Sequence, residues 1–291
     1  MKYGIYYAYW ETEWEADYLP YVEKVAKLGF DVLEIGAKPL ADYTPAQIRA
    51  LRQAAKDNGI MLTAGYGPAP HHNIGSGDPA IRKGAAKWYK KLFGVMGELD
   101  IHLIGGALYS HWPVDYSQPI RKEEDWKYAV EGMREMSALA KPYGIQLNME
   151  SLNRFEGYLI NTAQECVDFV KQVDCDNVWV MLDTFHMNIE ETDMAAAIRS
   201  AGKLLGHFHT GECNRLVPGK GRMPWREIGQ ALRDIGYDKT VVMEPFVNMG
   251  GQVGSDIKIW RTMVEDNRIE TLDKDAADAL RFQRYMLDGK M

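Results

Sequence analysis

Four side chains of the kinds that bind divalent cations stand at the ends of four successive apolar runs. They are Glu150, Asp183, His209 and Glu244, and the runs that carry them read IQLNME, VWVMLD, LLGHFH and TVVMEP. Their spacing of 26 to 35 residues is about the length of one strand–helix–strand unit. Since successive parallel strands end at the same edge of a sheet, we expect the four side chains to share one cation. This convergence predicts an enzyme.

The predicted ligand set contains three carboxylates, one imidazole and no thiol. Such an oxygen-rich set favours Mn²⁺, Mg²⁺ or Co²⁺ with six-coordinate geometry, which leaves positions open for substrate oxygens. A closed structural zinc site, which prefers Cys and His, fits it poorly. His207 and His209 lie two residues apart and face the same side of one strand, so either residue could be the ligand. We expect His209, which lies level with the other ends, and expect His207 to be a hydrogen-bonded neighbour.

Further polar and aromatic residues fall at or beyond the same strand ends. Glu156, His186 and Arg215 belong to loops that follow the candidate ligands, where they become candidates for binding substrate hydroxyls. An aromatic set suits the apolar C–H face of a sugar, and its members are Tyr6, Trp14, Tyr66, Trp112 and Phe246. The glycine-rich stretch Val217–Arg222 lacks the spacing of a phosphate loop and is predicted to be an ordinary turn.

One pattern recurs along the chain: an amphipathic helix, a glycine and an apolar strand. It predicts eight strands, at Tyr3–Tyr7, Val32–Ile35, Met61–Gly65, His102–Gly106, Gln146–Glu150, Val178–Leu182, Leu204–His209 and Thr240–Glu244. Helical spacing of apolar residues predicts helices over 19–28 and 162–173, and a final helix is expected over about 274–287. Thr44 with Gln47, and Thr162 with Glu165, read as capping boxes, and Pro45 adds to the first.

Eight such units in 291 residues match the size of a (β/α)8 TIM barrel. We expect a single barrel domain over residues 1–291 with an extra C-terminal helix, because no low-complexity linker divides the chain. A doubly wound open sheet is the alternative, but no GxGxxG motif follows the first strand, so a dinucleotide fold is disfavoured.

The composition limits the partners of the protein. A net charge of −7 and a pI near 5.6 disfavour a nucleic-acid partner, and no apolar run is long enough for a membrane span. The N-terminal segment reads as a first strand rather than a signal peptide. Three cysteines without CxxC spacing are expected to be free thiols in a reducing cytoplasm.

The candidate residues predict a proton transfer next to a carbonyl. A cation that chelates a carbonyl oxygen and its neighbouring hydroxyl would polarise the carbonyl, and a positioned carboxylate would then remove the adjacent proton. Glu150 and Glu244 lie three strands apart in an eight-strand ring, so they are expected to approach a substrate from opposite sides. Two bases on opposite faces are what inversion of a stereocentre requires, whereas an aldose–ketose isomerase needs only one.

Several segments also carry a resemblance to a known family. GIYYAYW, LNRFE, MLDTFHMNIEE, GHFHTGECNR, GKGRMPW and VVMEPF resemble the ketose 3-epimerases, the D-allulose (D-psicose) and D-tagatose 3-epimerases built on the xylose-isomerase-like barrel. The likeness covers essentially the whole chain. Ser151, where relatives carry an apolar residue, and the bulky Tyr66 between two glycines depart from the family pattern.

The resemblance implies a role for each candidate residue. It implies one Mn²⁺ or Co²⁺ per subunit, held by Glu150, Asp183, His209 and Glu244, with Glu150 and Glu244 as the acid–base pair. It places Glu156, His186 and Arg215 at the O1–O3 end of a ketohexose such as D-fructose. The side that faces O4–O6 would be lined by Tyr6, Trp14, Gly67, Trp112 and Phe246. The family is usually dimeric or tetrameric, which implies a homodimer or homotetramer.

Other functions compete with this one. An epimerase that prefers D-tagatose or D-sorbose, or an aldose–ketose isomerase of the same fold, would use nearly the same residues. A metal-dependent apurinic endonuclease would need a His-rich multi-zinc site and a basic face, which the composition does not offer. A sugar-binding protein without catalysis would not need two carboxylates beside its ligand.

Overall fold

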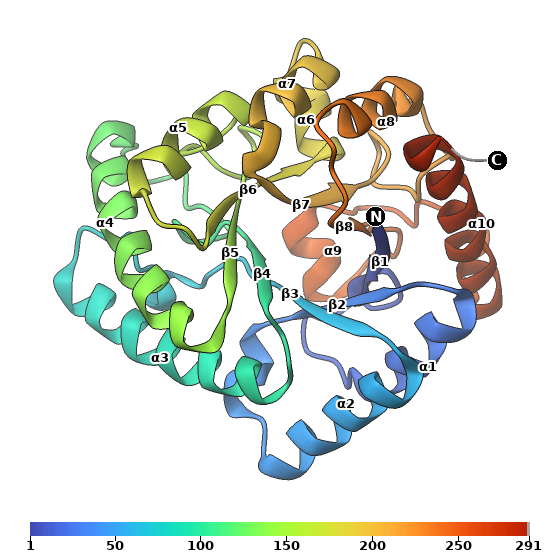
Figure 1. Cartoon of the computed structure of the whole chain (residues 1–291), viewed down its shortest axis with the longest axis horizontal. Helices are drawn as coiled ribbons and strands as arrows, with labels where there is room; N and C mark the ends of the chain where they lie inside the picture. Colours follow the sequence, from blue (N-terminus) through green and yellow to red (C-terminus); the bar gives the residue numbers. More distant parts are fainter. Residues whose placement is uncertain (290–291) are drawn as a thin grey trace.

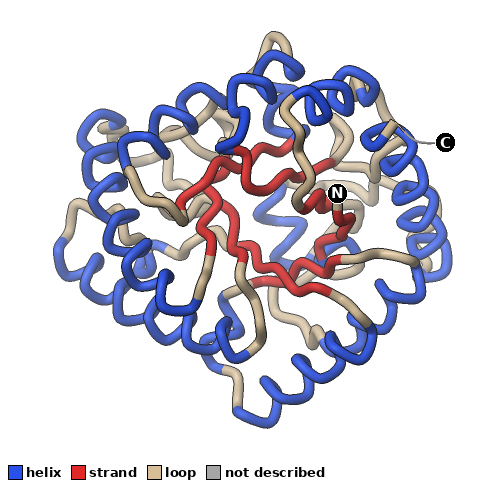
Figure 2. Tube along the Cα trace, viewed as in Figure 1, coloured by secondary structure: helices blue, strands red, loops and turns tan. Residues whose placement is uncertain are grey.

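The computed structural model describes residues 1–289, so residues 290 and 291 of the predicted domain lie outside the described part. Eight parallel strands form a closed barrel in which each strand pairs with the next and β8 pairs with β1 (Figures 1 and 2). The strands are β1 (Lys2–Tyr6), β2 (Val32–Gly36), β3 (Met61–Gly65), β4 (Leu103–Gly106), β5 (Gln146–Glu150), β6 (Val178–Asp183), β7 (Leu205–Thr210) and β8 (Thr240–Met243). The predicted (β/α)8 barrel is confirmed, and the open sheet is excluded.

All eight predicted strands are present, and the predicted bounds of β3 and β5 are correct. The other ends differ by one residue in most cases. Leu204 was expected to begin β7, but it closes a short 3-10 turn, η5 (Gly202–Leu204), so the strand begins at Leu205. Glu244 follows the last residue of β8, and its backbone N–H still donates to the Thr210 carbonyl at 2.9 Å. The side chain therefore keeps its place at the strand end.

Helices form a ring around the barrel (Figure 2). The helices are α1 (Leu19–Leu28), α2 (Pro45–Asn58), α3 (Pro79–Glu98), α4 (Lys122–Ala140), α5 (Ala163–Val173), α6 (Thr184–Glu190), α7 (Met194–Ala201), α8 (Trp225–Asp234), α9 (Gly251–Ile257) and α10 (Ile269–Asp288). Short 3-10 turns add η1 (Tyr7–Tyr9), η2 (Lys38–Asp42), η3 (Pro70–His72) and η4 (Lys141–Tyr143). Among the described helices, none combines the length and the apolarity needed to cross a bilayer.

The C-terminal helix α10 completes the ring by packing against α8 and α1 (Figure 1). It begins at Ile269, five residues before the predicted start near Lys274. Ile269 is 46% exposed, but Leu272 in the same turn is 1% exposed and lies in helical spacing with the buried Ala276 and Ala279. The predicted start therefore missed the first turn of the apolar stripe. Arg268, which precedes this turn, forms an ion pair with the carboxylate of Asp266.

The two predicted capping boxes differ in outcome. At α2, Thr44 Oγ1 accepts from the Gln47 N–H and Gln47 Oε1 accepts from the Thr44 N–H, so the box is complete. At α5, Thr162 Oγ1 accepts from the Glu165 N–H, but the Glu165 carboxylate accepts from the Asn161 N–H at 2.7 Å. The second box is therefore wrong in one half, because the glutamate binds the donor one residue earlier.

We predict that Thr44→Ala lowers the free energy of unfolding by about 1 kcal/mol, the usual cost of a lost N-cap. Thr44 is solvent-exposed, so no packing is lost with the hydroxyl. Urea unfolding followed by circular dichroism measures the change. Thr44→Ser keeps the cap and should leave the unfolding midpoint unchanged; equal losses in both variants would contradict the capping role.

Candidate metal centre and substrate pocket

A cavity of about 360 Å³ opens at the C-terminal ends of the barrel strands. This is the end at which TIM-barrel enzymes carry their active sites. Its lining includes every site residue predicted from the sequence except Asp183, which lies fully buried beside it. Helix α9, seen through the ring of strands in Figure 1, also contributes side chains to the cavity.

The four predicted ligands fall into two overlapping groups that share Asp183, and His186 joins one of them. One group is Asp183, His209 and Glu244, and the other is Glu150, Asp183 and His186; within each group the potential ligand atoms lie within 4.8 Å of one another. Glu150 and Asp183 are the last residues of β5 and β6, and His209 is the last but one of β7. Glu244 directly follows β8. The structure therefore gathers the four residues at one place, as their spacing predicts.

Two of these side chains carry buried atoms that lack a hydrogen-bond partner among the described residues. They are Glu150 Oε1 and His209 Nδ1. An unpaired buried polar atom costs about 1–3 kcal/mol, so such atoms in a folded protein require an explanation. Both are lone-pair atoms of the kinds that bind metals, and a divalent cation between them would satisfy both. The residues present therefore fit a metal with oxygen and nitrogen ligands.

His186 lies in α6 rather than in the loop expected from the sequence. It differs from His209 in which ring nitrogen faces the cluster. Its Nδ1 accepts hydrogen bonds from the Asn153 backbone N–H at 3.2 Å and the Asn153 side chain at 2.8 Å. Burial lowers the pKa of His186, so the ring is neutral and its proton sits on Nε2. That Nε2 lies 3.8 Å from Glu150 Oε1 and 3.9 Å from Asp183 Oδ2. His186 therefore offers a hydrogen-bond donor over the cluster, as a substrate-binding residue would.

Arg215 supplies the positive charge nearest the cluster. Its Nη1 lies 3.2 Å from Asp183 Oδ2 and 3.1 Å from Glu244 Oε2, and its Nη2 lies 3.4 Å from Glu156 Oε1. The sequence predicts contact with substrate, whereas the structure places the guanidinium against two candidate ligands as well. Arg215 has a left-handed backbone with φ of 64°, which is uncommon for a non-glycine residue and recurs at functional sites.

The loop that carries Arg215 is held by the buried Glu212. The Glu212 carboxylate accepts hydrogen bonds from the Gly219 and Met223 N–H groups and from the Trp225 indole. The turn predicted at Val217–Arg222 is present, with the Lys220 N–H bonded to the Val217 carbonyl. Glu212 was not recognised in the sequence, because its partners follow it by 7 to 13 residues in an irregular loop.

The pKa values of two glutamates in the pocket are shifted in opposite directions. Burial, together with Glu244 and Asp183, raises the pKa of Glu150 well above its usual value, although His209 and Arg215 oppose the shift. Burial also acts to raise the pKa of Glu156, but Arg215 and His186 outweigh it, and that pKa lies below its usual value. The two glutamates therefore have different environments despite lying in one pocket.

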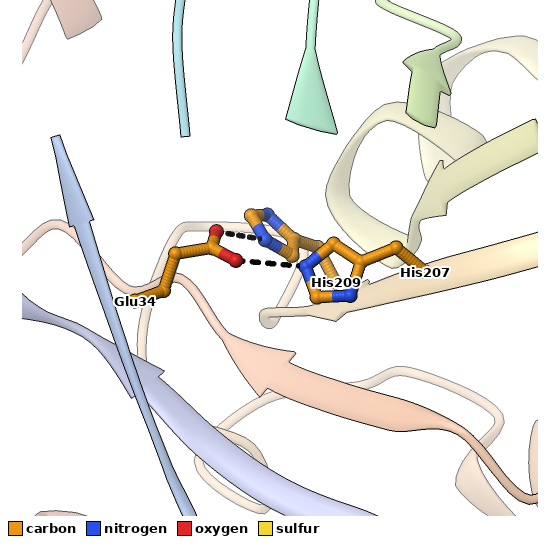
Figure 3. A group of neighbouring side chains, drawn as sticks. All are labelled: Glu34, His207 and His209. Atoms are coloured by element: carbon orange, nitrogen blue, oxygen red, sulfur yellow. Dashed lines mark hydrogen bonds and ion pairs between the residues drawn. The ribbon is translucent and has the colours of Figure 1, made fainter. Parts of the chain in front are cut away.

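A further buried acid, Glu34 on β2, lies beneath the cluster and was not predicted. Its carboxylate is bonded to His207 Nε2 at 2.9 Å and His209 Nε2 at 2.6 Å (Figure 3). Burial alone would raise the pKa of Glu34, but the two histidines hold it well below its usual range. His207 is hydrogen-bonded, as the sequence predicts, and its other nitrogen meets Thr240 Oγ1 at 2.7 Å. The available signal was a single charged residue inside the apolar run DVLEIG.

Aromatic rings form the opposite wall of the pocket. The Trp14 ring lies 5.9 Å from Trp112 and 6.0 Å from Phe246 in edge-to-face contacts, and Tyr6 lies 6.2 Å from Phe246. The Trp14 indole donates to Asp256 Oδ2 on α9 at 2.8 Å, which joins the wall to that helix. The four aromatic residues expected on this side therefore lie together.

Tyr66 and Gly67 follow β3, and Gly67 packs against the same wall. The Tyr66 hydroxyl is hydrogen-bonded to His72 Nδ1 at 2.6 Å, and burial lowers the pKa of His72 to about 4. A Cβ on Gly67 would lie 2.9 Å from the Trp112 ring. Only glycine permits the backbone to approach the indole this closely.

Comparisons with known proteins agree with this geometry. A family model described as the xylose isomerase-like TIM barrel matches residues 22–264. The chain is 60% identical over 288 residues to a D-psicose 3-epimerase of Ruminiclostridium cellulolyticum, with 99% of this chain and 98% of that protein covered. It is 55% identical to a D-psicose 3-epimerase of Agrobacterium fabrum, with 99% of this chain and 100% of that protein covered.

Solved structures give the same result. A crystal structure of D-psicose 3-epimerase with D-tagatose from Clostridium cellulolyticum H10 matches with a TM-score of 0.97 at 60% identity, covering 99% of both chains. A crystal structure of D-psicose 3-epimerase in the presence of D-fructose also gives 0.97, at 55% identity and with 99% of both chains covered. The chain therefore belongs to the xylose isomerase-like TIM-barrel family, within its ketose 3-epimerases. It is an isomerase, and the resemblance seen in its sequence is confirmed.

We predict that Gly67→Ala displaces the Trp112 ring and raises KM for a ketohexose by roughly tenfold or more, the range for one misplaced carbon in a binding pocket. Initial rates against substrate concentration measure the change. Gly84→Ala is the matched control, because a Cβ at this α3 position has no atom within 4 Å. An unchanged KM in Gly67→Ala would mean that the Trp112 wall does not position the substrate.

Proposed function

We propose that this protein interconverts D-fructose and D-psicose (D-allulose) by inverting C3 with the help of a bound divalent cation. The observation that carries the proposal is the pair of glutamates, Glu150 at the end of β5 and Glu244 directly after β8, which line one pocket. Relatives named D-psicose 3-epimerases at 55–60% identity over almost the whole chain support the substrate.

The proposed metal ligands are Glu150, Asp183, His209 and Glu244, with Mn²⁺ or Co²⁺, or alternatively Mg²⁺, as the ion and one ion per subunit. The unpaired Glu150 Oε1 and His209 Nδ1 support this assignment. When bound, the cation would polarise a ketose carbonyl and stabilise negative charge on its oxygen.

The two glutamates act as base and acid on opposite faces of the substrate. One carboxylate takes the C3 proton, the C–H electron pair forms a C2–C3 double bond, and the carbonyl electron pair moves onto O2. The carboxylic acid on the other face then gives its proton to C3, and the C2 carbonyl re-forms. The result is inversion at C3, and the direction of reaction decides which glutamate is the base.

The surrounding side chains orient the sugar for this transfer. We assign Glu156, His186 and Arg215 to the O1–O3 end, because each has a donor or acceptor beside the cluster. The O4–O6 end is assigned to the apolar wall of Tyr6, Trp14, Gly67, Trp112 and Phe246. An apolar wall holds the C–H face and excludes water without fixing each hydroxyl, so several ketohexoses can enter.

Preference for another ketohexose is the second candidate. A related D-psicose 3-epimerase is described in complex with D-tagatose, which supports D-tagatose as a further substrate. Tyr66 lines the pocket, and Ser151 lies buried directly after Glu150, so these positions can alter the preference. An aldose–ketose isomerase of the same fold would use only one of the two glutamates for proton transfer.

We also propose that residues 1–291 form one barrel domain that acts in the cytoplasm as a homodimer or homotetramer. The closed barrel with α10 packed against α1 and α8 supports one domain. The three cysteines, described as free thiols, suit a reducing compartment. Phe155, 72% exposed in the loop after β5, supports a contact with a second copy.

We predict that removal of metal with a chelator abolishes the reaction and that Mn²⁺ restores it. In D₂O, D-fructose should yield D-psicose with deuterium at C3, read by proton NMR after separation of the sugars. The loss should be roughly 100-fold or more, since the cation supplies several kcal/mol. Glucose or mannose labelled at C2 would instead identify an isomerase, and full activity after chelation would exclude a metal-dependent reaction.

We predict that Glu150→Gln and Glu244→Gln each lower kcat by about 10²–10⁴-fold, the contribution of one acid–base group. Each variant keeps one base, so in D₂O each should exchange the C3 proton of only one of the two epimers, and the two variants should differ in which. Bound Mn²⁺ is measured in parallel, because both residues are proposed ligands. Glu135→Gln on the exposed face of α4 is the control. Exchange of both epimers by either variant would rule out the two-base scheme.

A further inference from the structure

The interior of the barrel beneath the candidate metal centre holds a buried charge that the epimerisation itself does not use. Glu34 on β2 is fully buried and accepts three hydrogen bonds. The donors are Thr63 Oγ1 at 2.8 Å, His207 Nε2 at 2.9 Å and His209 Nε2 at 2.6 Å. Figure 3 shows both imidazoles turned toward the one carboxylate. Glu34 therefore connects β2 with β7 across the barrel interior.

The carboxylate determines where the His209 proton lies. An ionised carboxylate only accepts hydrogen bonds, so the ring nitrogen that faces it must carry a hydrogen. For His209 this nitrogen is Nε2. The other nitrogen, Nδ1, has no hydrogen-bond partner among the described residues and lies 3.7 Å from Glu244 Oε2. With Nε2–H held by Glu34, the lone pair available for a cation is on Nδ1, on the side of Asp183 and Glu244.

The remaining contacts fix the carboxylate in turn. Thr63 stands opposite Glu34 in the register of β2 and β3, and Thr240 stands opposite His207 in the register of β7 and β8. Thr63 and His207 both bond Oε2, which leaves Oε1 directed at His209. Thr240 bonds His207 Nδ1 and holds that ring in place. Every hydrogen bond of the network therefore joins two strands of the barrel, and its members all lie on β2, β3, β7 and β8.

We propose that Glu34 is a positioning residue that sets His209 as a metal ligand: its carboxylate holds Nε2–H and so presents the Nδ1 lone pair to the cation. This inference rests on the proposed metal-dependent function. His207 serves the same arrangement by holding the second oxygen of Glu34 and is not itself a ligand. Carboxylate partners of ligating histidines also raise the basicity of the ring, so their loss weakens metal binding by roughly 10–100-fold.

The test is Glu34→Gln, which keeps the shape of the side chain and removes its charge. Calorimetric titration of the chelator-treated protein with Mn²⁺ should give a dissociation constant raised by roughly 10–100-fold relative to the unaltered chain. Glu34→Asp, which keeps the charge but withdraws it by one methylene, should weaken binding in the same direction. Ser137→Ala is the matched control for loss of a buried hydrogen bond, since Ser137 Oγ bonds Asn177 Oδ1 between α4 and β6. It should lower the melting temperature without changing Mn²⁺ affinity.

A second measurement does not depend on any variant folding. The side-chain ¹⁵N NMR spectrum of histidine-labelled protein, loaded with diamagnetic Mg²⁺, should show His209 with hydrogen on Nε2 and none on Nδ1. A hydrogen on Nδ1 with a metal-bound Nε2 would overturn the inference. So would a Glu34→Gln protein that melts earlier but binds Mn²⁺ as tightly as the unaltered chain. Failure of the unaltered chain to bind Mn²⁺ would instead remove the metal-dependent function on which the inference rests.

Discussion

Concentrated negative charge in a buried place is the constraint on which this site depends. Glu150 and Asp183 are buried at the open end of the barrel, Glu34 is buried beneath them, and Glu244 joins them at the edge. Carboxylates removed from water are costly unless cations or hydrogen-bond donors surround them. Arg215 and the histidines supply part of that compensation within the chain. The unpaired atoms of Glu150 and His209 are where a divalent cation would supply the rest.

The charged and polar residues of the site lie at three levels of the barrel: within the strands, at the strand ends and above them. Strand interiors below the cluster hold Glu34, His207 and Thr63 in a network whose bonds all lie between strands. The strand ends hold the candidate ligands. Above them, His186 is held in α6, and Glu156 and Arg215 are held in loops. Because the lowest level is hydrogen-bonded from strand to strand, it can fix which nitrogen of a histidine faces the pocket.

The other side of the pocket is formed by aromatic rings rather than by charged groups. Edge-to-face contacts join Trp14, Trp112 and Phe246, and Asp256 on α9 binds the Trp14 indole. Such a wall discriminates by shape rather than by hydrogen bonds to each hydroxyl. Polar groups gather at the cluster and aromatic rings form the opposite wall, and relatives at 55–60% identity are described with more than one ketohexose.

The sequence by itself determined the repeating unit, the eight strands and the positions of the candidate ligands. These are local properties: an apolar run, a capping glycine and a polar residue at a strand end are all read within a few residues. The complete capping box at Thr44 is local in the same way. The prediction was wrong at the second half of the Thr162 box, where the Glu165 carboxylate binds the N–H one residue earlier. It also missed the first turn of α10, although Leu272 continues the apolar spacing of that helix.

Only the tertiary structure decided what surrounds the candidate ligands. Glu34 meets His207 and His209 across separations of 173 and 175 residues, because closure of the barrel brings β2 opposite β7. Asn153 selects the nitrogen of His186 that faces the cluster, and the left-handed backbone at Arg215 turns its guanidinium onto Asp183 and Glu244. A single glutamate in an apolar strand has no local partner, so the sequence could not identify it. Its role follows from packing, which depends on the closed ring of strands.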